Sequence, residues 1–328
     1  MGLIKTTFTL LGLAAGSYVG VSSAMAAKLT QVNRVRHEVN PKTVKLDFRN
    51  VLFTSRGGGT ELSGWLIAPP CNQLEPLPIT RDTSWVIMVN GDDASRSDSK
   101  TGTLGIAREL HRHGFGIFMC DLRGRGDSPS TMSSSGLFEQ LDVLGASDYL
   151  VSNGANRTKI GILGFSLGGS VALLAGSKHN SFGAVVSDSA FADLEMLIKT
   201  SMTGVKRIMR VCLPGMKFMA QLLHEIDIRE ISPARAIART DTPVLIIHGE
   251  EDPKVPVEHA RLLGRAIGAS FDEIELGKES IWIVPRAGHT GAFRTEPDTY
   301  IEKLVRFYEE HLVASRNHNS SNYNSNDR

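Results

Sequence analysis

The sequence is poor in cysteine and almost without net charge. Its three cysteines, Cys71, Cys120 and Cys212, include no closely spaced pair, which argues against a disulfide framework and a cysteine-based zinc site. Lysine and arginine number 36 against 35 acidic residues, a net charge of +1. Such a chain has no general field to attract nucleic acid. We therefore expect no nucleic-acid partner, and nothing in the sequence implies a metal or an organic cofactor. A Cys71–Cys212 bridge would form only outside the reducing cytosol.

Charge is also missing from the N-terminal segment, where no residue between Lys5 and Lys28 is ionisable at neutral pH. The stretch ends in Ala24-Met25-Ala26, a small-x-small pattern typical of signal-peptidase cleavage before Ala27. It is also about as long as the 20 residues that cross a bilayer, and basic residues follow it closely. We therefore expect residues 1–27 to be a signal peptide or a membrane anchor, outside the fold. The protein would then be exported, to the periplasm or beyond the cell, or membrane-anchored.

The other end of the chain has little apolar sequence. Residues 314–328 are dominated by asparagine and serine and cannot bury enough surface to offset the entropy of ordering, so we expect a disordered tail. No linker or repeat interrupts the sequence between these two ends. Residues 28–313 are therefore predicted to form one domain of the 328-residue chain.

Within this domain, short apolar runs alternate with amphipathic stretches of helical length. This alternation predicts an α/β fold with a mostly parallel central sheet and helices on both faces. The first two runs flank Gly57-Gly58-Gly59 and suggest an antiparallel edge. The expected strands are 44–53, 62–67, 85–89, 116–120, 160–163, 184–186, 244–247 and 281–284, and the clearest helices lie around 103–113, 137–150, 170–175 and 301–312.

One stretch breaks the alternation. From Leu194 to Ile231 the apolar residues recur at helical spacing and no strand pattern appears, while Pro214-Gly215 separates two helical runs. Residues 194–231 are therefore predicted to be a helical lid insertion. The alternative is a pair of ordinary surface helices with core faces, since methionine-rich stripes are more often plain packing.

The chemistry centres on Gly164-Phe165-Ser166-Leu167-Gly168, which matches the G-x-S-x-G nucleophile elbow. In this motif the serine occupies a sharp turn, and glycines two residues away on each side avoid clashes with the strand and helix. An expected strand precedes the motif and a helix of small apolar residues follows it. This strand–turn–helix setting makes Ser166 the candidate nucleophile.

A serine hydroxyl needs a positioned base, and a carboxylate must orient that base. Among the 10 histidines, His289 lies in a loop just past the last expected strand, whereas His248 ends a strand and suits a structural role. Asp252 follows the strand 244–247 and is the candidate acid, giving the chain order Ser, Asp, His that this kind of site uses. Its rivals are Glu250, Glu251 and Asp188.

An oxyanion hole requires two N–H donors. The backbone N–H of Leu167, at the start of the helix after the elbow, is one candidate. The N–H of Asp92, in the loop after strand 85–89, is the other, with Asp93 as its rival. Aspartates in such loops also cap helices and form turns, a role compatible with main-chain donation.

Together these residues resemble the α/β-hydrolase superfamily, closest to its serine esterases and the related prolyl-oligopeptidase-type catalytic domains. The resemblance runs from about Val44 to Leu312. By this resemblance, Asp121 to Ser128 is a structural turn. The family often has His-Gly where this chain has Asn90-Gly91, which leaves the backbone donor but changes the side chain. The matching stretches are 62–66, 121–128, 164–169, 188–193, 248–256 and 288–289.

We therefore expect a serine hydrolase that cleaves carboxylic esters of small molecules through an acyl-enzyme. Peptide or amide hydrolysis by the same triad is the first alternative, ranked lower because no propeller-sized extension gates the site. A non-catalytic binding protein on the same fold is the second, because fold does not fix function. The apolar lid suggests an apolar acyl group. Proteins similar to this one often carry an N-terminal membrane segment, which favours attachment through residues 1–27.

Overall fold

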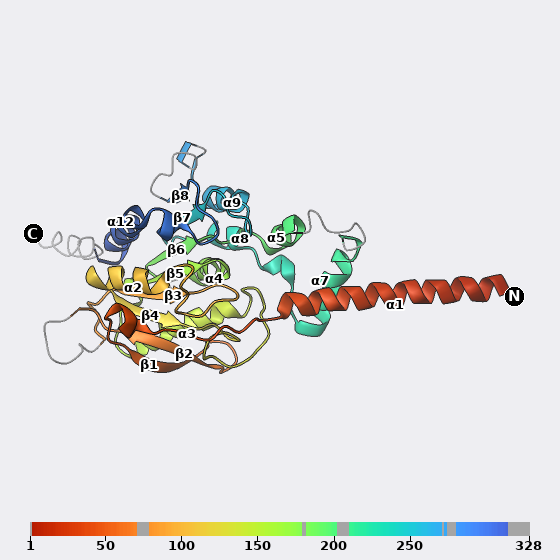
Figure 1. The fold of residues 1–328 in the computed structure, drawn as a ribbon, viewed down its shortest axis with the longest axis horizontal. Coiled ribbons are helices and arrows are strands. Elements are labelled where there is room, and N and C mark those ends of the chain that lie inside the picture. Colours follow the sequence, from red (N-terminus) through yellow and green to blue (C-terminus); the bar gives the residue numbers. More distant parts are fainter. Residues whose placement is uncertain are drawn as a thin grey trace, which may run out of the picture.

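The computed structural model describes residues 2–70, 79–178, 182–201, 210–270, 272–273 and 280–313. An eight-stranded sheet in the order β1-β2-β4-β3-β5-β6-β7-β8 forms its centre (Figure 1). β1 and β2 pair antiparallel, as does β2 with β4, and all other neighbours are parallel. The mostly parallel α/β fold with an antiparallel edge is thereby confirmed. The strands are β1 (Arg49–Thr54), β2 (Glu61–Ile67), β3 (Trp85–Val89), β4 (Gly116–Cys120), β5 (Ile160–Phe165), β6 (Ala184–Asp188), β7 (Val244–Gly249) and β8 (Ile281–Val284).

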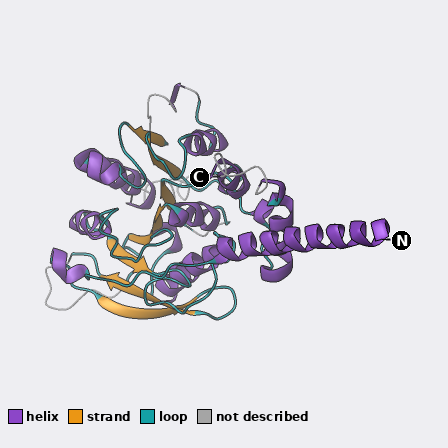
Figure 2. Cartoon of the chain, turned by 45° about the vertical axis from the view of Figure 1, so that its right-hand side comes forward, coloured by secondary structure: helices purple, strands orange, loops and turns teal. Residues whose placement is uncertain are grey.

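The central strands are apolar on both sides because helices cover both faces of the sheet (Figure 2). Side chains of α3, α4, α8 and α9 share one core with one face, and those of α2 and α12 share a second core with the other. The bounds are α2 (Thr103–Arg112), α3 (Glu139–Ser152), α4 (Leu167–Gly176), α8 (Pro233–Ile237), α9 (Glu258–Ala266), α11 (Ala292–Thr295) and α12 (Pro297–Tyr308), with short helical turns η1 (Pro41–Val44), η2 (Arg157–Lys159), η3 (Ile228–Glu230) and η4 (Glu309–Val313).

The first expected strand begins later than the apolar pattern suggested. Residues 41–44 form the turn η1, with Pro41 at its start, and Lys45 adopts a left-handed φ of 62°. That backbone conformation is incompatible with a strand, so β1 starts only at Arg49.

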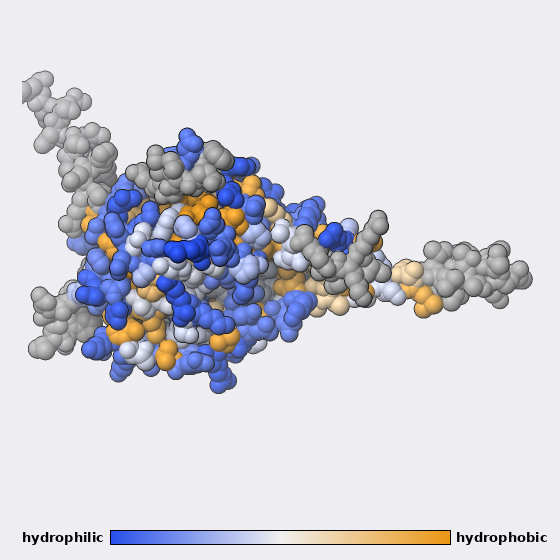
Figure 3. Space-filling model, turned by 45° about the horizontal axis from the view of Figure 1, so that its top comes forward, coloured by the Kyte–Doolittle hydropathy of each residue, from blue (hydrophilic) through white to orange (hydrophobic). Residues whose placement is uncertain are grey.

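The N-terminal segment forms the long helix α1 (Gly2–Thr30), which runs beside α7 and projects from the domain (Figure 1). Its described surface is largely apolar (Figure 3), with Leu13, Val19 and Val21 exposed. Ser22 and Ala26 are buried, so the helix packs on the domain across the boundary expected at residue 27. In the described part of the chain, no helix combines the length and hydrophobicity of a membrane-crossing segment.

Between β6 and β7 the described residues contain α5 (Leu194–Ser201), α7 (Leu213–His224), η3 and α8, without a strand. Pro214 lies in the first turn of α7, where its missing N–H costs nothing, and so begins this helix. The lid assignment for 194–231 stays a prediction. The expected disordered tail at 314–328 and the cysteine Cys71 lie outside the described residues, whereas Cys120 and Cys212 are free and buried.

Candidate active site

The parallel strands bring three candidate residues to one edge of the sheet. Ser166 follows β5, Asp252 lies in the loop after β7, and His289 lies in the loop after β8. Because the carboxyl ends of parallel strands share an edge, three positions separated by up to 123 residues meet there. The sequence predicted Ser166 from its motif and Asp252 and His289 from their loop positions, and the structure places the three side chains in contact.

The turn at Ser166 is strained in the way the motif demands. Ser166 has φ 55° and ψ −122°, a conformation that non-glycine residues rarely adopt. A Cβ added to Gly164 would lie 2.2 Å from the carbonyl oxygen of Gly168, and one added to Gly168 would lie 2.2 Å from that of Val89. Only glycine permits this close approach of strand, turn and helix, which holds the serine hydroxyl at the edge of the sheet.

Two short hydrogen bonds connect the three side chains. Ser166 Oγ lies 2.7 Å from His289 Nε2, and His289 Nδ1 lies 2.7 Å from Asp252 Oδ2. With the Nδ1–H donating to the carboxylate, Nε2 is free to accept the serine proton. This geometry is the one that a serine nucleophile, its base and an orienting acid require.

Asp252 is held as a carboxylate. Burial alone would raise the pKa of this group, but the hydrogen bond from His289 and two backbone donors outweigh it, and the pKa lies below its usual value. The N–H groups of Lys254 and Val255 donate to Oδ1 at 2.8 and 2.9 Å, leaving Oδ2 for His289. A negative charge at this position can stabilise a protonated His289.

The rival residues are placed differently. Glu250 and Glu251 are exposed, and neither contacts His289 by any hydrogen bond in the described structure. Asp188 is buried and accepts hydrogen bonds from Ser189 Oγ and Tyr300 Oη at 2.9 and 3.1 Å. Burial raises its pKa to about 6. His248 is buried with its Nε2 2.8 Å from the Val255 carbonyl oxygen, which is a structural contact.

The proposed oxyanion donors flank the nucleophile. Leu167 begins α4 directly after Ser166, and Asp92 and Asp93 line the same cavity. A Cβ added to Gly91 would lie 3.2 Å from Ser166 Oγ, so the backbone of this loop reaches the nucleophile. The Asp92 carboxylate pairs with Arg125, which leaves its N–H as the group available to a substrate. The role of the two N–H groups stays a prediction.

Asn90, which stands where the family usually has histidine, holds the candidate oxyanion loop in place. Asn90 donates its side-chain amide to the carbonyl oxygen of Ser95, which closes the loop over residues 90–95. The residue is buried. Asn90, in place of the histidine, therefore adds a hydrogen bond within the loop.

The turn from Asp121 to Ser128 has the structural role that the resemblance implies. Asp121 accepts from the backbone N–H of Asp127 and of Arg96, and Ser128 Oγ donates to the Asp121 carbonyl oxygen at 2.8 Å. His37, Asp121 and Asp127 also place ligand-type atoms within 4.8 Å of one another. The Arg96 guanidinium bonds both carboxylates and His37, so an internal cation already pairs with this cluster.

A cavity of about 640 Å³ opens above Ser166 and His289. Its walls come from the loops at the sheet edge, from the start of α4 at Leu167, and from the helices α1, α5 and α7. The walls are mainly apolar, with charged groups such as Lys28 and Lys254 also contributing. The apolar lining residues include Met25, Leu29, Leu167, Phe191, Leu194, Leu197, Ile198, Met216 and Val255.

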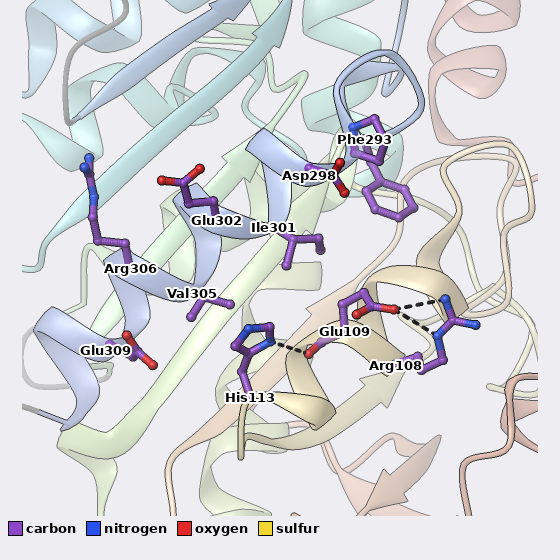
Figure 4. A pocket seen from close by; sticks show the side chains of 11 residues that line it. Arg108, Glu109, His113, Phe293, Asp298, Ile301, Glu302, Val305, Arg306 and Glu309 are labelled. Atoms are coloured by element: carbon purple, nitrogen blue, oxygen red, sulfur yellow. Dashed lines mark hydrogen bonds and ion pairs between the residues drawn. The ribbon is translucent and has the colours of Figure 1, made fainter.

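A second groove, of about 680 Å³, lies between α2 and α12 (Figure 4). Arg108 and Glu109 form an ion pair there, and His113 Nδ1 bonds the Glu109 carbonyl oxygen. The described residues that line this groove include no serine, cysteine or threonine. The cavity above Ser166 is therefore the candidate active site.

The fold and this site define the class of the protein as an α/β-hydrolase of the serine hydrolase type. Residues 108–315 match the prolyl oligopeptidase family, and the chain belongs to that family. This confirms the resemblance inferred from the motifs.

Individual relatives are distant. The uncharacterized protein YqkD of Bacillus subtilis is 27% identical over 59% of this chain, and the match spans 62% of YqkD. YfhR of Escherichia coli K12 is 25% identical, covering 79% of both chains. Among solved structures, the Pyrococcus furiosus esterase Pf2001 aligns with a TM-score of 0.64 and 22% identity over 86% of this chain and 99% of that one. The Pyrococcus horikoshii acylaminoacyl peptidase aligns with a TM-score of 0.56 and 21% identity, over 83% and 42% of the two chains. At these identities the structures show the shared fold.

Sequence reasoning missed two features of the site. Met25 lines the cavity although residues 1–27 were predicted to be a signal peptide or an anchor outside the fold. Arg125, buried within the structural turn, reaches the candidate oxyanion loop through Asp92. Neither contact has a local sequence signal, because each depends on segments that meet only in the folded protein.

Proposed function

We propose that this serine hydrolase cleaves carboxylic esters through an acyl-enzyme intermediate. The observation that carries the proposal is the pair of 2.7 Å hydrogen bonds linking Ser166, His289 and Asp252 at the base of a mainly apolar cavity. Such a cavity suits the acyl group of an ester, and the chain of hydrogen bonds suits attack by the serine oxygen.

In the acylation step, Ser166 Oγ attacks the ester carbonyl carbon while His289 Nε2 takes the hydroxyl proton. The carbonyl oxygen becomes an oxyanion beside the N–H groups of Leu167 and Asp92, where preorganised donors stabilise it. Collapse of this intermediate breaks the bond to the alcohol oxygen, which leaves with the proton from His289. Asp252 stabilises the imidazolium throughout these transfers.

Deacylation repeats the sequence with water. His289 takes a proton from the water as its oxygen attacks the acyl carbon, and a second oxyanion forms at the same donors. The bond to Ser166 Oγ then breaks, the serine recovers its proton from His289, and the carboxylic acid leaves. Each proton transfer uses the same ring nitrogen, Nε2, which lies 2.7 Å from Ser166 Oγ.

Labelling and turnover test the proposal together. The full chain is incubated with a fluorophosphonate, the adduct is mapped by mass spectrometry, and p-nitrophenyl esters of increasing length are assayed. We expect one adduct on Ser166 and ester turnover that Ser166→Ala reduces by at least a thousandfold. Retention of more than a tenth of the activity in Ser166→Ala would refute the mechanism. A folded protein with neither adduct nor turnover would favour a binding protein.

Peptide or amide hydrolysis is the second candidate, favoured by membership of the prolyl oligopeptidase family. The same triad would act, with His289 giving its proton to the leaving amine nitrogen. A comparison of aminoacyl anilides with short acyl esters separates the two candidates. A kcat/KM for anilides equal to or above that for esters would make the peptidase assignment the better one.

We also propose that the protein is exported or attached to a membrane through its N-terminal helix. α1 and α7 contact each other, and both helices expose apolar side chains, such as Leu13 and Val19 on α1 and Phe218 on α7. Flotation of the full chain with phospholipid vesicles tests attachment, with Leu13→Asp as the disruptive variant. Recovery of all the protein in the soluble fraction, with or without the substitution, would contradict attachment.

A further inference from the structure

We infer that the last two turns of α1 form a permanent wall of the acyl pocket, and that Met25 and Leu29 limit the length of the apolar acyl chain it accepts. The inference rests on the proposed function, since it concerns the substrate of the same site. It also assigns a role in the active enzyme to residues whose sequence resembles a removable leader.

The cavity itself supplies the first observation. Met25 and Leu29 line the same space as Ser166 and His289, and both are half-buried. Opposite the loops that carry the triad, the wall is completed by side chains of α5 and α7, such as Ile198 and Met216. An acyl chain attached to Ser166 would therefore meet apolar side chains from α5 and α7 and from α1, which is distant from both in sequence.

The packing of α1 against α7 supplies the second observation. Tyr18, Ser22, Met25 and Leu29 recur at intervals of three or four residues and so share one face of the helix. On this face, Tyr18 Oη accepts a 3.0 Å hydrogen bond from the Gly215 N–H, and Ser22 Oγ lies 3.5 Å from the Cys212 carbonyl oxygen.

The two helices approach so closely that the contact requires glycine. A Cβ added to Gly215 would lie 2.3 Å from Ser22 Oγ and 2.8 Å from a ring carbon of Tyr18. Ala26, one residue after Met25, has 0% of its surface exposed. The opposite side of the helix is open, with Gly20, Ala24 and Ala27 exposed. Val19 lies on the flank between the two sides and is 52% exposed. The face that carries Met25 is therefore packed on the domain.

The end of α1 is fixed to the structural turn after β4, which supplies the third observation. The Thr30 carbonyl oxygen accepts from the Ser133 N–H at 2.9 Å. Arg34 donates to the carbonyl oxygens of Gly126 and Ser128 at 2.7 and 2.9 Å. Arg125 of the same turn pairs with Asp92 beside the nucleophile. The same turn, residues 121–128, therefore contacts both the segment that follows α1 and the candidate oxyanion loop.

These contacts bear on the cleavage site suggested by the sequence. A cut before Ala27 would remove Met25 and the buried Ala26 and leave Leu29 on a helix remnant. The pocket would then lose the part of its wall that α1 supplies through Met25. We therefore favour the uncleaved form of the N-terminal segment in the active enzyme.

The chemistry of the wall selects the substrate class. Met25 and Leu29 are uncharged and apolar, and methionine adapts its shape to a ligand. Each methylene buried against such a wall adds about a fourfold gain in affinity. Affinity should rise along an ester series until the chain reaches these two side chains and then stop rising.

The test uses the full chain and two tryptophan substitutions on the same helix. Met25→Trp places a larger side chain in the pocket, and Val19→Trp places one at an exposed position as the matched control. The readout is the ratio of kcat/KM for p-nitrophenyl decanoate to that for p-nitrophenyl acetate. We expect Met25→Trp to lower this ratio at least tenfold through KM, and Val19→Trp to change it less than twofold.

Two further variants decide the matter if tryptophan prevents folding, as judged by thermal melting. Met25→Ala and Leu29→Ala only remove atoms from the limiting wall, and each should raise the decanoate-to-acetate ratio about four- to tenfold because the acyl chain can bury further methylenes. Equal ratios in these variants, in Val19→Trp and in the unaltered chain would overturn the inference while leaving ester hydrolysis intact. An unaltered chain without ester turnover or labelling of Ser166 would overturn both.

The mature N-terminus provides an independent outcome. Intact-mass measurement of the protein from its own cells should give a chain that still contains Met25. An active enzyme beginning at Ala27 with an unchanged decanoate-to-acetate ratio would overturn the inference.

Discussion

The backbone N–H of Ser166 donates a 2.8 Å hydrogen bond to the carbonyl oxygen of Asp188. Asp188 ends β6, and the next residue, Ser189, accepts through its Oγ a hydrogen bond from the Thr290 N–H beside His289. The end of β6 thus holds both the nucleophile turn and the loop of the candidate base. The buried carboxyl group of Asp188 is not part of the hydrogen-bonded triad. The backbone of Asp188 and the Ser189 side chain support the geometry of the triad.

The first prediction concerns the pH dependence that Asp188 introduces. Burial raises its pKa from 3.8 to about 6, so between these values the folded protein holds a proton that the unfolded chain has released. The contribution of Asp188 to the free energy of unfolding therefore falls as pH rises from about 4 to 6. Asp188→Asn removes this change, and its stability relative to the unaltered protein should improve by up to about 3 kcal/mol across that window. Urea unfolding at pH 4.5 and 7 measures the difference, and a constant difference would contradict the assignment.

The second prediction tests the acid of the triad. Asp252→Asn keeps an oxygen for the Lys254 and Val255 N–H groups but can present an amide N–H to His289 Nδ1, which favours the wrong tautomer. The expected loss in kcat for an activated ester is on the order of 10⁴. The exposed neighbour Glu251 provides the matched control, and Glu251→Gln should change kcat less than twofold. A larger loss in the control than in Asp252→Asn would reassign the acid.

The third prediction concerns stability in acid. His259 has 0% of its surface exposed, and its Nδ1 accepts a 3.1 Å hydrogen bond from the Ala192 N–H. Burial, with a smaller effect of His248, lowers its pKa from 6.5 to about 4. The unfolded chain therefore gains a proton before the folded protein does, and the free energy of unfolding should fall by up to about 3 kcal/mol as pH drops from 6.5 to 4.

The variant His259→Asn isolates this effect, since its side-chain oxygen can accept the same N–H without taking up a proton. Its stability should depend less steeply on pH between 6.5 and 4 than that of the unaltered protein, whatever its stability at pH 7. Chemical unfolding at several pH values provides the two slopes. Parallel slopes would show that His259 titrates normally in the folded state.

The fourth prediction tests the close approach at the nucleophile turn. Gly168→Ala directs a Cβ to 2.2 Å from the Val89 carbonyl oxygen, so the backbone must shift. We expect a loss of about 2–4 kcal/mol in stability and loss of fluorophosphonate labelling at Ser166. Gly288→Ala is the control, because a Cβ there would meet nothing within 4 Å although it adjoins His289. Thermal melting and fluorophosphonate labelling are measured for both variants. Normal labelling of Gly168→Ala would contradict the requirement for glycine at this position.

The sequence was sufficient to predict the sheet because its signals are local. Val86, Ile87 and Met88 form a continuous apolar run, and glycines surround Ser166 at fixed spacing. Loops after parallel strands meet at one edge, which is why Asp252 and His289 could be assigned before their contact was seen. The start of β1 was predicted too early because Lys45 takes a left-handed conformation, which the neighbouring sequence does not indicate.

The parts that could not be predicted depend on distant contacts. An uncharged helix looks the same in sequence whether it crosses a membrane, directs export or packs on a domain, and the burial of Ala26 depends on α7. The pairing of Arg125 with Asp92 likewise needs two loops from different strands to meet. Periodicity identifies the face of a helix that is buried but not the partner that buries it.

Because α1 packs on α7, the N-terminal helix can reach its final position only after α7 has been synthesised. Ser22 Oγ lies 3.5 Å from the Cys212 carbonyl oxygen, although the two residues are 190 positions apart in the sequence. At ribosomal speeds that interval lasts about 10 to 40 s, during which the first helix made has no partner to pack on. The wall that α1 forms requires the chain through α7, and the pocket is complete only when His289, which also lines it, has emerged. Hydrolytic activity toward long acyl chains would therefore mark the end of biosynthesis.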